Sequence, residues 1–310
     1  MDIEINSVDA EDSGLISSVQ RFSLHDGPGI RTTIFMKGCS LKCEWCANPE
    51  TMGLEPQLMT LLKKCTRCGR CITACPNEAI ALTHEAIDVA WDKCDQCQKC
   101  VDACATGALE TNGKRVSTEE LMAEIASDRE FYETSGGGVT FSGGEPLVQW
   151  KFVLQMLKRC KARRINTSLD TTGNVSWNIL EQVLPYTDLV LYDVKHLDDE
   201  AHKAKTGIGN RMILRNLEKI ARNARVWLRI PVIPGFNDSE QHLERVGRLA
   251  VELGAERVSL FPFHKWGEGK YERLGKAYLL SESVLPPKPE DLEKHRALLV
   301  GVGAEVSIGK

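Results

Sequence analysis

The stretch MKGCSLKCEWCANPE, residues 36–50, decides how the rest of the chain is interpreted. Its cysteines, Cys39, Cys43 and Cys46, follow the spacing C-x3-C-x2-C. Three thiolates can hold three corners of a [4Fe–4S] cubane, and the fourth iron then stays open to bind a substrate directly. A structural zinc site needs four ligands, and no further cysteine or histidine lies nearby to complete one. The stretch therefore predicts a catalytic iron–sulfur cluster.

Two further cysteine runs form an internal repeat with an offset of 29 residues. Each follows C-x2-C-x2-C-x3-C, the spacing of two-cluster bacterial ferredoxins, in which the fourth cysteine of each run binds the other cluster. The pattern predicts one cluster on Cys65, Cys68, Cys71 and Cys104, and a second on Cys94, Cys97, Cys100 and Cys75. A pair of zinc sites is the alternative, but zinc ligand pairs are usually spaced by a dozen or more residues.

Composition limits the other possibilities. The 310 residues, 42% hydrophobic and 26% charged, predict an ordinary globular protein of about two domains. A net charge of −4 gives no basic footprint for nucleic acid, and no apolar run is long enough for a membrane helix. Residues 1–14 are acidic and predict a loosely ordered extension rather than an export signal. Twelve cysteines without such a signal favour metal binding in the cytoplasm.

Short β-rich runs alternate with helical segments along the remaining chain. Expected strands are 32–37, 137–142, 166–170, 188–194, 226–233 and 257–262, and expected helices are 117–133, 148–163, 176–184, 210–224, 239–253 and 289–300. This alternation predicts βαβ units and a parallel sheet. Six units fall short of the eight that close a barrel. We therefore expect an α/β fold, a partial (β/α)6 barrel of residues 15–55 and 114–310, with a ferredoxin-like module at 56–113.

In parallel α/β folds, ligands bind at the carboxyl ends of the strands. The three-cysteine loop follows the first strand, so its cluster is expected at the mouth of the barrel, where the missing units leave a lateral opening for a polypeptide. Other polar residues end later strands: Gly143, Gly144, Glu145, Asp170, Thr171, Asp193, Lys195 and His264. Taken singly, each is equally typical of a turn or a surface. Cys160 lies on an apolar helical face and is expected in the core.

The cysteine loop, with Trp45 before its last cysteine, resembles the signature of the radical S-adenosylmethionine (SAM) superfamily. The longer stretch SLHDGPGIRTTIFMKGCSLKCEWCANPE, residues 23–50, resembles the N-terminal signature of glycyl-radical enzyme activating enzymes, the pyruvate formate-lyase activase family. The segment from Asp26 to Thr32 is its most distinctive part. With its two-cluster insert, the chain looks like the longer subgroup of that family.

The resemblance implies roles for particular residues. It implies that Gly143, Gly144 and Glu145 meet the amino group of SAM, and that Asp170 and Thr171 contribute to the SAM site. Lys195 would pair with the methionine carboxylate, and Asp193 with a ribose hydroxyl or a nearby cation. His264 would lie beside the nucleoside, Trp45, Ala47 and Asn48 would border the adenine, and Asp26 would lie near an incoming peptide.

The resemblance also implies an activity, that of an oxidoreductase with three [4Fe–4S] clusters. The reduced Cys39/Cys43/Cys46 cluster would cleave SAM to a 5′-deoxyadenosyl radical, which would take hydrogen from a backbone glycine of a partner glycyl-radical enzyme. A low-potential donor such as flavodoxin or ferredoxin would supply the electron. Two alternatives stay open: a radical SAM enzyme acting on a small molecule or another peptide, and an iron–sulfur electron-transfer protein.

Overall fold

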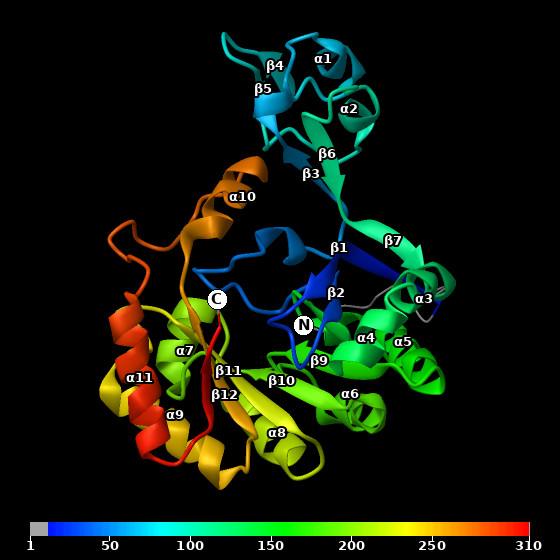
Figure 1. The fold of residues 1–310 in the computed structure, drawn as a ribbon. Helices are drawn as coiled ribbons and strands as arrows, with labels where there is room; N and C mark the ends of the chain where they lie inside the picture. Colours follow the sequence, from blue (N-terminus) through cyan, green and yellow to red (C-terminus); the bar gives the residue numbers. More distant parts are fainter. Residues whose placement is uncertain (1–11, 310) are drawn as a thin grey trace.

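The six expected strands form the parallel part of one sheet in the computed structural model, which describes residues 12–309 (Figure 1). They are β2 (Arg31–Met36), β8 (Gly138–Gly143), β9 (Asn166–Thr171), β10 (Leu189–Asp193), β11 (Val226–Val232) and β12 (Arg257–Pro262). They lie side by side in chain order, and the short strand β13 (Val306–Ile308) adds a parallel neighbour to β12. The predicted α/β fold with a parallel sheet is confirmed.

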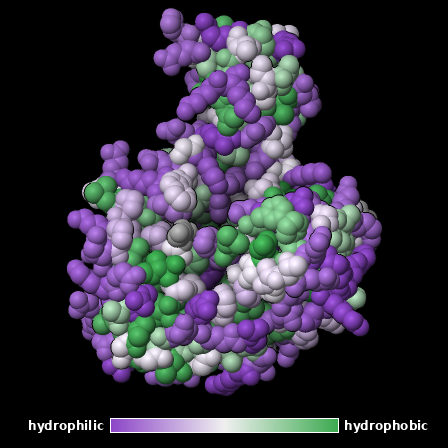
Figure 2. All heavy atoms as spheres, viewed as in Figure 1, coloured by the Kyte–Doolittle hydropathy of each residue, from purple (hydrophilic) through white to green (hydrophobic). Residues whose placement is uncertain are grey.

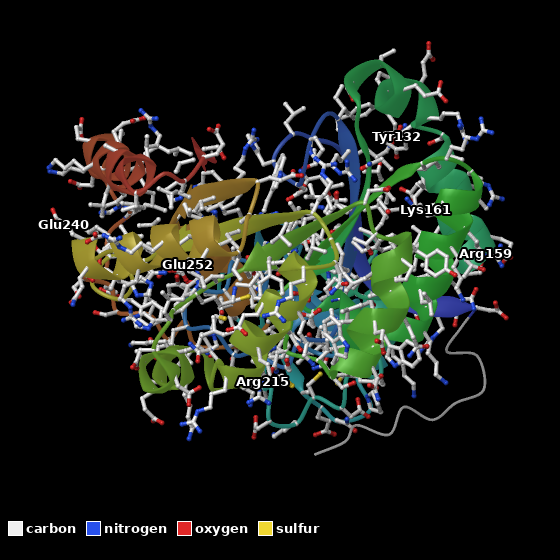
Figure 3. All side chains as sticks on the ribbon, turned by 90° about the horizontal axis from the view of Figure 1, so that it is seen from below. Tyr132, Arg159, Lys161, Arg215, Glu240 and Glu252 are labelled. Carbon is white, nitrogen blue, oxygen red and sulfur yellow. The ribbon has the colours of Figure 1, made fainter. Side chains whose placement is uncertain are left out.

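Helices cover the sheet between these strands. The main ones are α5 (Trp150–Ala162), α6 (Trp177–Val183), α7 (Asp199–Thr206), α8 (Arg211–Ala221), α9 (Glu240–Glu252) and α11 (Pro289–Gly301). Their apolar faces and the central strand residues, among them Phe141, Leu169 and Leu228, form one large buried core. Cys160 belongs to it, with no exposed surface and its sulfur 3.7 Å from that of Met122. Figure 3 views the molecule from below and shows α9 between its labelled ends, Glu240 and Glu252.

The single helix expected over 117–133 is wrong. The chain forms α3 (Thr118–Ala126), which begins with the capping box of Ser117 and Glu120, and then a separate α4 (Arg129–Ser135). Asp128 stands at the break with its side chain buried, where it accepts hydrogen bonds from Arg21 Nε at 2.9 Å and Thr32 Oγ1 at 2.6 Å. Because Asp128 turns toward the sheet to make these bonds, the helix is interrupted.

Two antiparallel strands were not anticipated. β1 (Ser13–Ser23) pairs with β2, and its first four residues pair with β7 (Lys114–Ser117) on its other side. The expected extension therefore ends earlier than residue 14, since Ser13 and Gly14 lie within β1. Gly14 packs on α5, where a Cβ would come within 2.3 Å of the Phe152 ring. Residues 1–11, which formed the rest of that extension, lie outside the described residues.

A small lobe projects from the sheet between β2 and β7 (Figure 1, top). Its stem is the antiparallel pair β3 (Gln57–Thr60) and β6 (Leu109–Asn112), and beyond it lie α1 (Arg70–Ala74), β4 (Ile80–Leu82), β5 (Ile87–Val89) and α2 (Lys99–Asp102). The lobe has its own buried cluster, which includes Leu58, Ile80, Val89 and Leu109. Figure 2 shows it standing off the body on a narrower neck.

Three contacts hold the lobe against the body. At the stem, Lys37 is fully buried, and its ammonium donates to the Glu50 carbonyl at 2.5 Å and lies 3.3 Å from Asn112 Oδ1. Further out, Arg273 at the end of α10 (Glu268–Arg273) donates to the Thr60 carbonyl at 3.0 Å. Just beyond α10, Gly275 lies against the Trp91 indole of the lobe.

The Gly275 contact predicts the effect of one added methyl group. Gly275 has a φ of +64°, and a Cβ there would stand 2.2 Å from Trp91. Gly275→Ala should therefore cost about 1–3 kcal/mol of overpacking in addition to the left-handed backbone penalty. Urea unfolding followed by tryptophan fluorescence measures the loss.

Gly254→Ala is the matched control for this prediction. Gly254 has nearly the same φ, +65°, but nothing lies within 4 Å of its Cβ position. It should therefore show the backbone penalty alone. Equal losses in the two variants would mean that Trp91 does not hold the lobe at this point.

Candidate functional site

A cavity of about 430 Å³ opens at the carboxyl ends of the parallel strands. Its lining comes from the ends of six strands in succession: Phe35 of β2, Gly143 of β8, Asp170 of β9, Asp193 of β10, Arg229 of β11 and Phe261 of β12. The volume falls within the usual range of cofactor and ligand sites, roughly 300–1,000 Å³.

Most of the predicted site residues meet in this cavity. Its lining contains Asp26, Cys43, Trp45, Cys46, Ala47, Asn48, Gly143, Asp170, Asp193, Lys195 and His264. Of the residues predicted for the SAM site and its cluster, those that lie outside the lining are Cys39, Gly144, Glu145 and Thr171. Residues from the ends of four strands and from the two loops on either side of β2 are thus gathered at one place.

The three-cysteine loop is held by backbone hydrogen bonds. Gly38 N donates to the Thr51 carbonyl at 2.7 Å, and Lys42 N donates to the Thr206 carbonyl at 2.8 Å. Burial raises the pKa of Cys43 to about 12 and that of Cys46 to about 11. Such thiols stay protonated at neutral pH unless a bound metal supplies positive charge, as iron does when thiolates ligate it.

The glycine pair and Glu145 follow one another at the end of β8. Gly143 lines the cavity, but Gly144 packs behind it, where a Cβ would stand 2.2 Å from the Gly38 carbonyl oxygen. The Glu145 carboxylate is fully buried and accepts hydrogen bonds from Thr171 Oγ1 at 2.7 Å, Thr172 N at 2.9 Å and Thr172 Oγ1 at 2.7 Å. Glu145 and Thr171 therefore bind each other across the sheet, and neither lines the cavity. That they contact SAM stays a prediction.

Arg229 is the main residue that sequence reasoning missed. Its guanidinium lies 3.2 Å from Asp26 Oδ1 and 3.5 Å from Asp170 Oδ2, and it stacks over the Phe261 ring at 4.4 Å. Burial lowers its pKa, but attraction to Asp170 and Asp26 outweighs burial, and the pKa is raised. The one signal in the sequence is a charged residue in the otherwise apolar stretch VWLRIPV.

A second ion pair faces the first. Lys195 Nζ donates to Asp193 Oδ2 at 2.8 Å, and the lysine side chain is only 10% exposed. Burial alone lowers the pKa of Lys195, but attraction to Asp193 and to the Cys43 sulfur raises it overall, so the group is charged at any physiological pH.

Two buried polar atoms in the cavity lining have no hydrogen-bond partner, Asp170 Oδ1 and His264 Nδ1. Burial and the nearby Asp193 raise the pKa of Asp170 to about 7, although Arg229 and a hydrogen bond from Ser142 oppose this. Leaving a buried acceptor unpaired costs about 1–3 kcal/mol. A polar ligand with donors near both atoms would remove that cost, and SAM, with its amino, carboxylate and nucleoside groups, fits this requirement.

The lobe contains two separate hollows, each surrounded by four cysteines. One is lined by Cys65, Cys68, Cys71 and Cys104, and the other by Cys75, Cys94, Cys97 and Cys100. In each, three cysteines come from one run and the fourth from the other. In both runs, the residues on either side of the second cysteine have left-handed backbone conformations. They are Arg67 and Gly69 in the first run and Gln96 and Gln98 in the second. The loops therefore wrap around their hollows in the same way.

In the described part of the chain, no three His, Cys, Asp or Glu side chains are grouped to hold one metal ion. A zinc ion draws four ligands to about 2.0–2.3 Å from one point, whereas a cubane keeps its cysteines farther apart on its outer corners.

Comparisons with known proteins agree with this site. The model of the radical SAM superfamily matches residues 33–246. Over 274 residues, 86% of each chain, the protein is 42% identical to the (2S)-3-sulfopropanediol dehydratase activating enzyme of Klebsiella oxytoca. It is 40% identical to the trans-4-hydroxy-L-proline dehydratase activating enzyme of Clostridioides difficile, covering 95% of this chain and 99% of that one. The chain belongs to the activating enzymes of glycyl-radical enzymes, within the radical SAM superfamily.

The predicted family is thereby confirmed, and with it the predicted class of activity, activation of a glycyl-radical enzyme by radical SAM chemistry. A radical SAM methyltransferase from Sphaerobacter thermophilus shares the fold, with a TM-score of 0.53 at 15% identity over 98% of this chain and 74% of that one. No helix among residues 12–309 of this activating enzyme is long and apolar enough to cross a membrane.

The role of Glu145 can be tested by Glu145→Gln. One amide group would then face the donors of Thr171 and Thr172, so we expect a loss of about 1–3 kcal/mol in unfolding free energy. SAM affinity of the folded protein should change less than about threefold. Denaturant unfolding and calorimetric SAM titration measure the two quantities, with the exposed Glu181→Gln as control. A tenfold loss of affinity at unchanged stability would mean that Glu145 binds SAM directly.

Proposed function

We propose that this activating enzyme carries three [4Fe–4S] clusters, one on Cys39, Cys43 and Cys46 and two in the lobe. The crossed cysteine sets support the lobe clusters: each hollow is lined by three cysteines of one run and the fourth cysteine of the other. This exchange is how two-cluster ferredoxins use the same spacing. These crossed sets support a ferredoxin-like insert, and iron analysis distinguishes it from the zinc alternative.

Different residues of the cavity bind different parts of SAM in this proposal. Lys195 pairs with the methionine carboxylate, and Asp170, with its free Oδ1, accepts from the amino group. His264 and the stretch from Trp45 to Asn48 border the nucleoside; Trp45 is fixed by its packing on Phe236, with ring centroids 5.0 Å apart. The cluster beside them supplies the one-electron reduction that cleaves the C5′–S bond of SAM.

Asp26 and Arg229 form the part of the cavity that faces the substrate peptide in this proposal. Asp26 is held by hydrogen bonds from Ser23 Oγ at 2.6 Å and Thr33 Oγ1 at 2.8 Å, besides its ion pair with Arg229. Attraction to Arg229 and these bonds lower the pKa of Asp26 although burial alone would raise it, so it is an anion in the resting site.

A cation near Asp193 stays a prediction. Asp26, Asp170 and Asp193 all line the cavity, and Arg229 places a positive charge 3.5 Å from Asp170 Oδ2. The electron donor that we propose is a low-potential flavodoxin or ferredoxin, acting in the cytoplasm, because iron–sulfur potentials reach about −700 mV.

Iron content tests the three-cluster proposal. Anaerobically reconstituted protein should hold about twelve irons, and Cys39→Ala and Cys97→Ala should each lose about four, because each removes a ligand of a different cubane. Cys160→Ala is the control, since that cysteine lies in the core and should leave the count unchanged. About four irons in the wild type, or stoichiometric zinc, would contradict the proposal.

Lys195→Met tests the SAM site. Losing the ion pair with the methionine carboxylate should weaken SAM binding about 10–100-fold, while iron content stays at the wild-type value. Calorimetric titration of the reconstituted protein measures the affinity. Lys161→Met is the control: Lys161 pairs with Asp188, which precedes β10 at the amino end of that strand, whereas the cavity-lining Asp193 ends it. Unchanged SAM affinity in the Lys195 variant would remove this residue from the site.

A further inference from the structure

The outer edge of β1 has a neighbouring strand along only part of its length. β7 pairs with Ser13 to Ile16, and its last pair joins Ile16 to Lys114. From Ser17 to Ser23, β1 pairs with β2 on one side, and within residues 12–309 no strand lies on the other. The cause is the turn at Gly113, which has a φ of +110° and joins the lobe strand β6 to β7, so that the chain before Lys114 does not continue along β1.

This free edge is accessible. Ser18, Gln20, Arg21 and Phe22 are exposed, Phe22 by 49% of its surface. The pairing of β1 with β2 shifts register between Ile16 and Ser18 and again between Gln20 and Ser23. The regular part of the edge is therefore Ser18 to Gln20, about 10 Å of strand, which can pair with a short extended segment. An unpaired edge presents N–H and C=O groups that can accept a further strand.

The edge leads directly into the cavity. Gln20 and Ser23 of β1 line the cavity together with Cys43 and Cys46. The pairing with β2 is irregular between Gln20 and Ser23, and Phe22 there has a φ of +59°. A left-handed residue in a strand marks a kink, so a strand added to this edge ends beside the cavity-lining Ser23.

The chemistry of the substrate favours recognition by such an edge. Activation takes a hydrogen atom from a glycine, which has no side chain by which its position could be fixed. Backbone hydrogen bonds to the neighbouring residues are then the available means of setting its register, and strand addition supplies them.

We propose that the free edge of β1, Ser17 to Ser23, binds an extended segment of the partner glycyl-radical enzyme as an added strand, next to the glycine that enters the cavity. The proposal rests on the function proposed above. The occupant is argued from the continuity of the edge with the SAM cavity and from the turn at Gly113, which opens the edge only where it approaches that cavity.

Proline substitution tests the proposal at two adjacent positions, Ser18 and Val19. Their N–H groups point to opposite sides of β1, since both lie in a regular stretch paired with Phe35 and Ile34 of β2. Amide hydrogen exchange of the free protein identifies which N–H faces outward, because that one exchanges faster. Proline at the outward position should leave the Tm near the wild-type value, whereas proline at the inward position removes a ladder bond and lowers it.

The probes are the unactivated glycyl-radical enzyme that this chain activates and a synthetic peptide spanning its glycine. We expect the outward proline to weaken binding of both about tenfold, the effect of one or two lost backbone bonds, while Ser18→Ala and Val19→Ala keep wild-type affinity. Binding should also slow exchange of the outward amide. Wild-type affinity in the outward proline variant, at wild-type Tm, would overturn the proposal.

Other occupants of the edge are outcomes of the same experiment. The amides of Ser18 and Val19 could both exchange slowly in the free protein. If one of them exchanges fast when residues 1–11 are deleted, the edge is occupied by residues 1–11 of this chain. Slow exchange that depends on protein concentration would assign it to a second copy. Either result overturns the proposal.

Formation of 5′-deoxyadenosine from SAM by the wild type tests the proposed function separately. A failure of the proposed function can therefore be distinguished from a failure of the strand-addition proposal.

Discussion

The catalytic loop depends on one backbone contact between the ends of β2 and β8. The Gly38 carbonyl accepts a hydrogen bond from Glu145 N at 2.7 Å, and Gly144 approaches it so closely that no side chain fits. The Glu145 carboxylate then binds Thr171 and Thr172 at the end of β9. A single buried acid thereby joins three strand ends behind the cysteine loop. These hydrogen bonds hold the cysteine loop in place before a cluster binds. The free energy needed to order the loop on binding is therefore smaller.

The charges of the cavity form two groups, and each group contains both signs. Arg229 lies between Asp26 and Asp170, and Lys195 lies beside Asp193. Burying any of these charges alone would be costly, but each has a partner of opposite sign. SAM carries a carboxylate as well as two positively charged groups. A cavity that offers charges of both signs suits such a ligand better than a uniformly charged cavity.

The insertion of the lobe has a second structural consequence. Where the chain passes from the stem of the lobe through Gly113 into β7, β1 has no neighbour beyond Ile16 and an open strand edge remains. The buried ammonium of Lys37 holds that stem, since it lies near Asn112 and Gln57, the opposed residues at the base of β3 and β6. The cysteine loop begins two residues after Lys37. The lobe, the free edge and the cysteine loop are therefore structurally connected.

Local spacing was enough to predict the cysteine sets, the six parallel strands and the strand ends that carry polar residues. These features depend on residues that are close in sequence or on the regular alternation of strands and helices. The strand β1 was missed because SGLISSVQRFS is too polar to stand out, and its pairing with β2 and β7 is what orders it.

The directions of individual side chains were decided by the tertiary structure. In the sequence, Glu145 follows two glycines at a turn, and nothing local says that its carboxylate points to β9 rather than into the cavity. Arg229 appears only as one charge in an apolar strand, because its partners Asp26 and Asp170 lie 203 and 59 residues away. Asp128 breaks a helix because Thr32 and Arg21, about a hundred residues earlier, require its carboxylate. Spacing along the chain determines which groups can bind a cluster, whereas the partner of a buried charge depends on which distant strands the fold brings beside it.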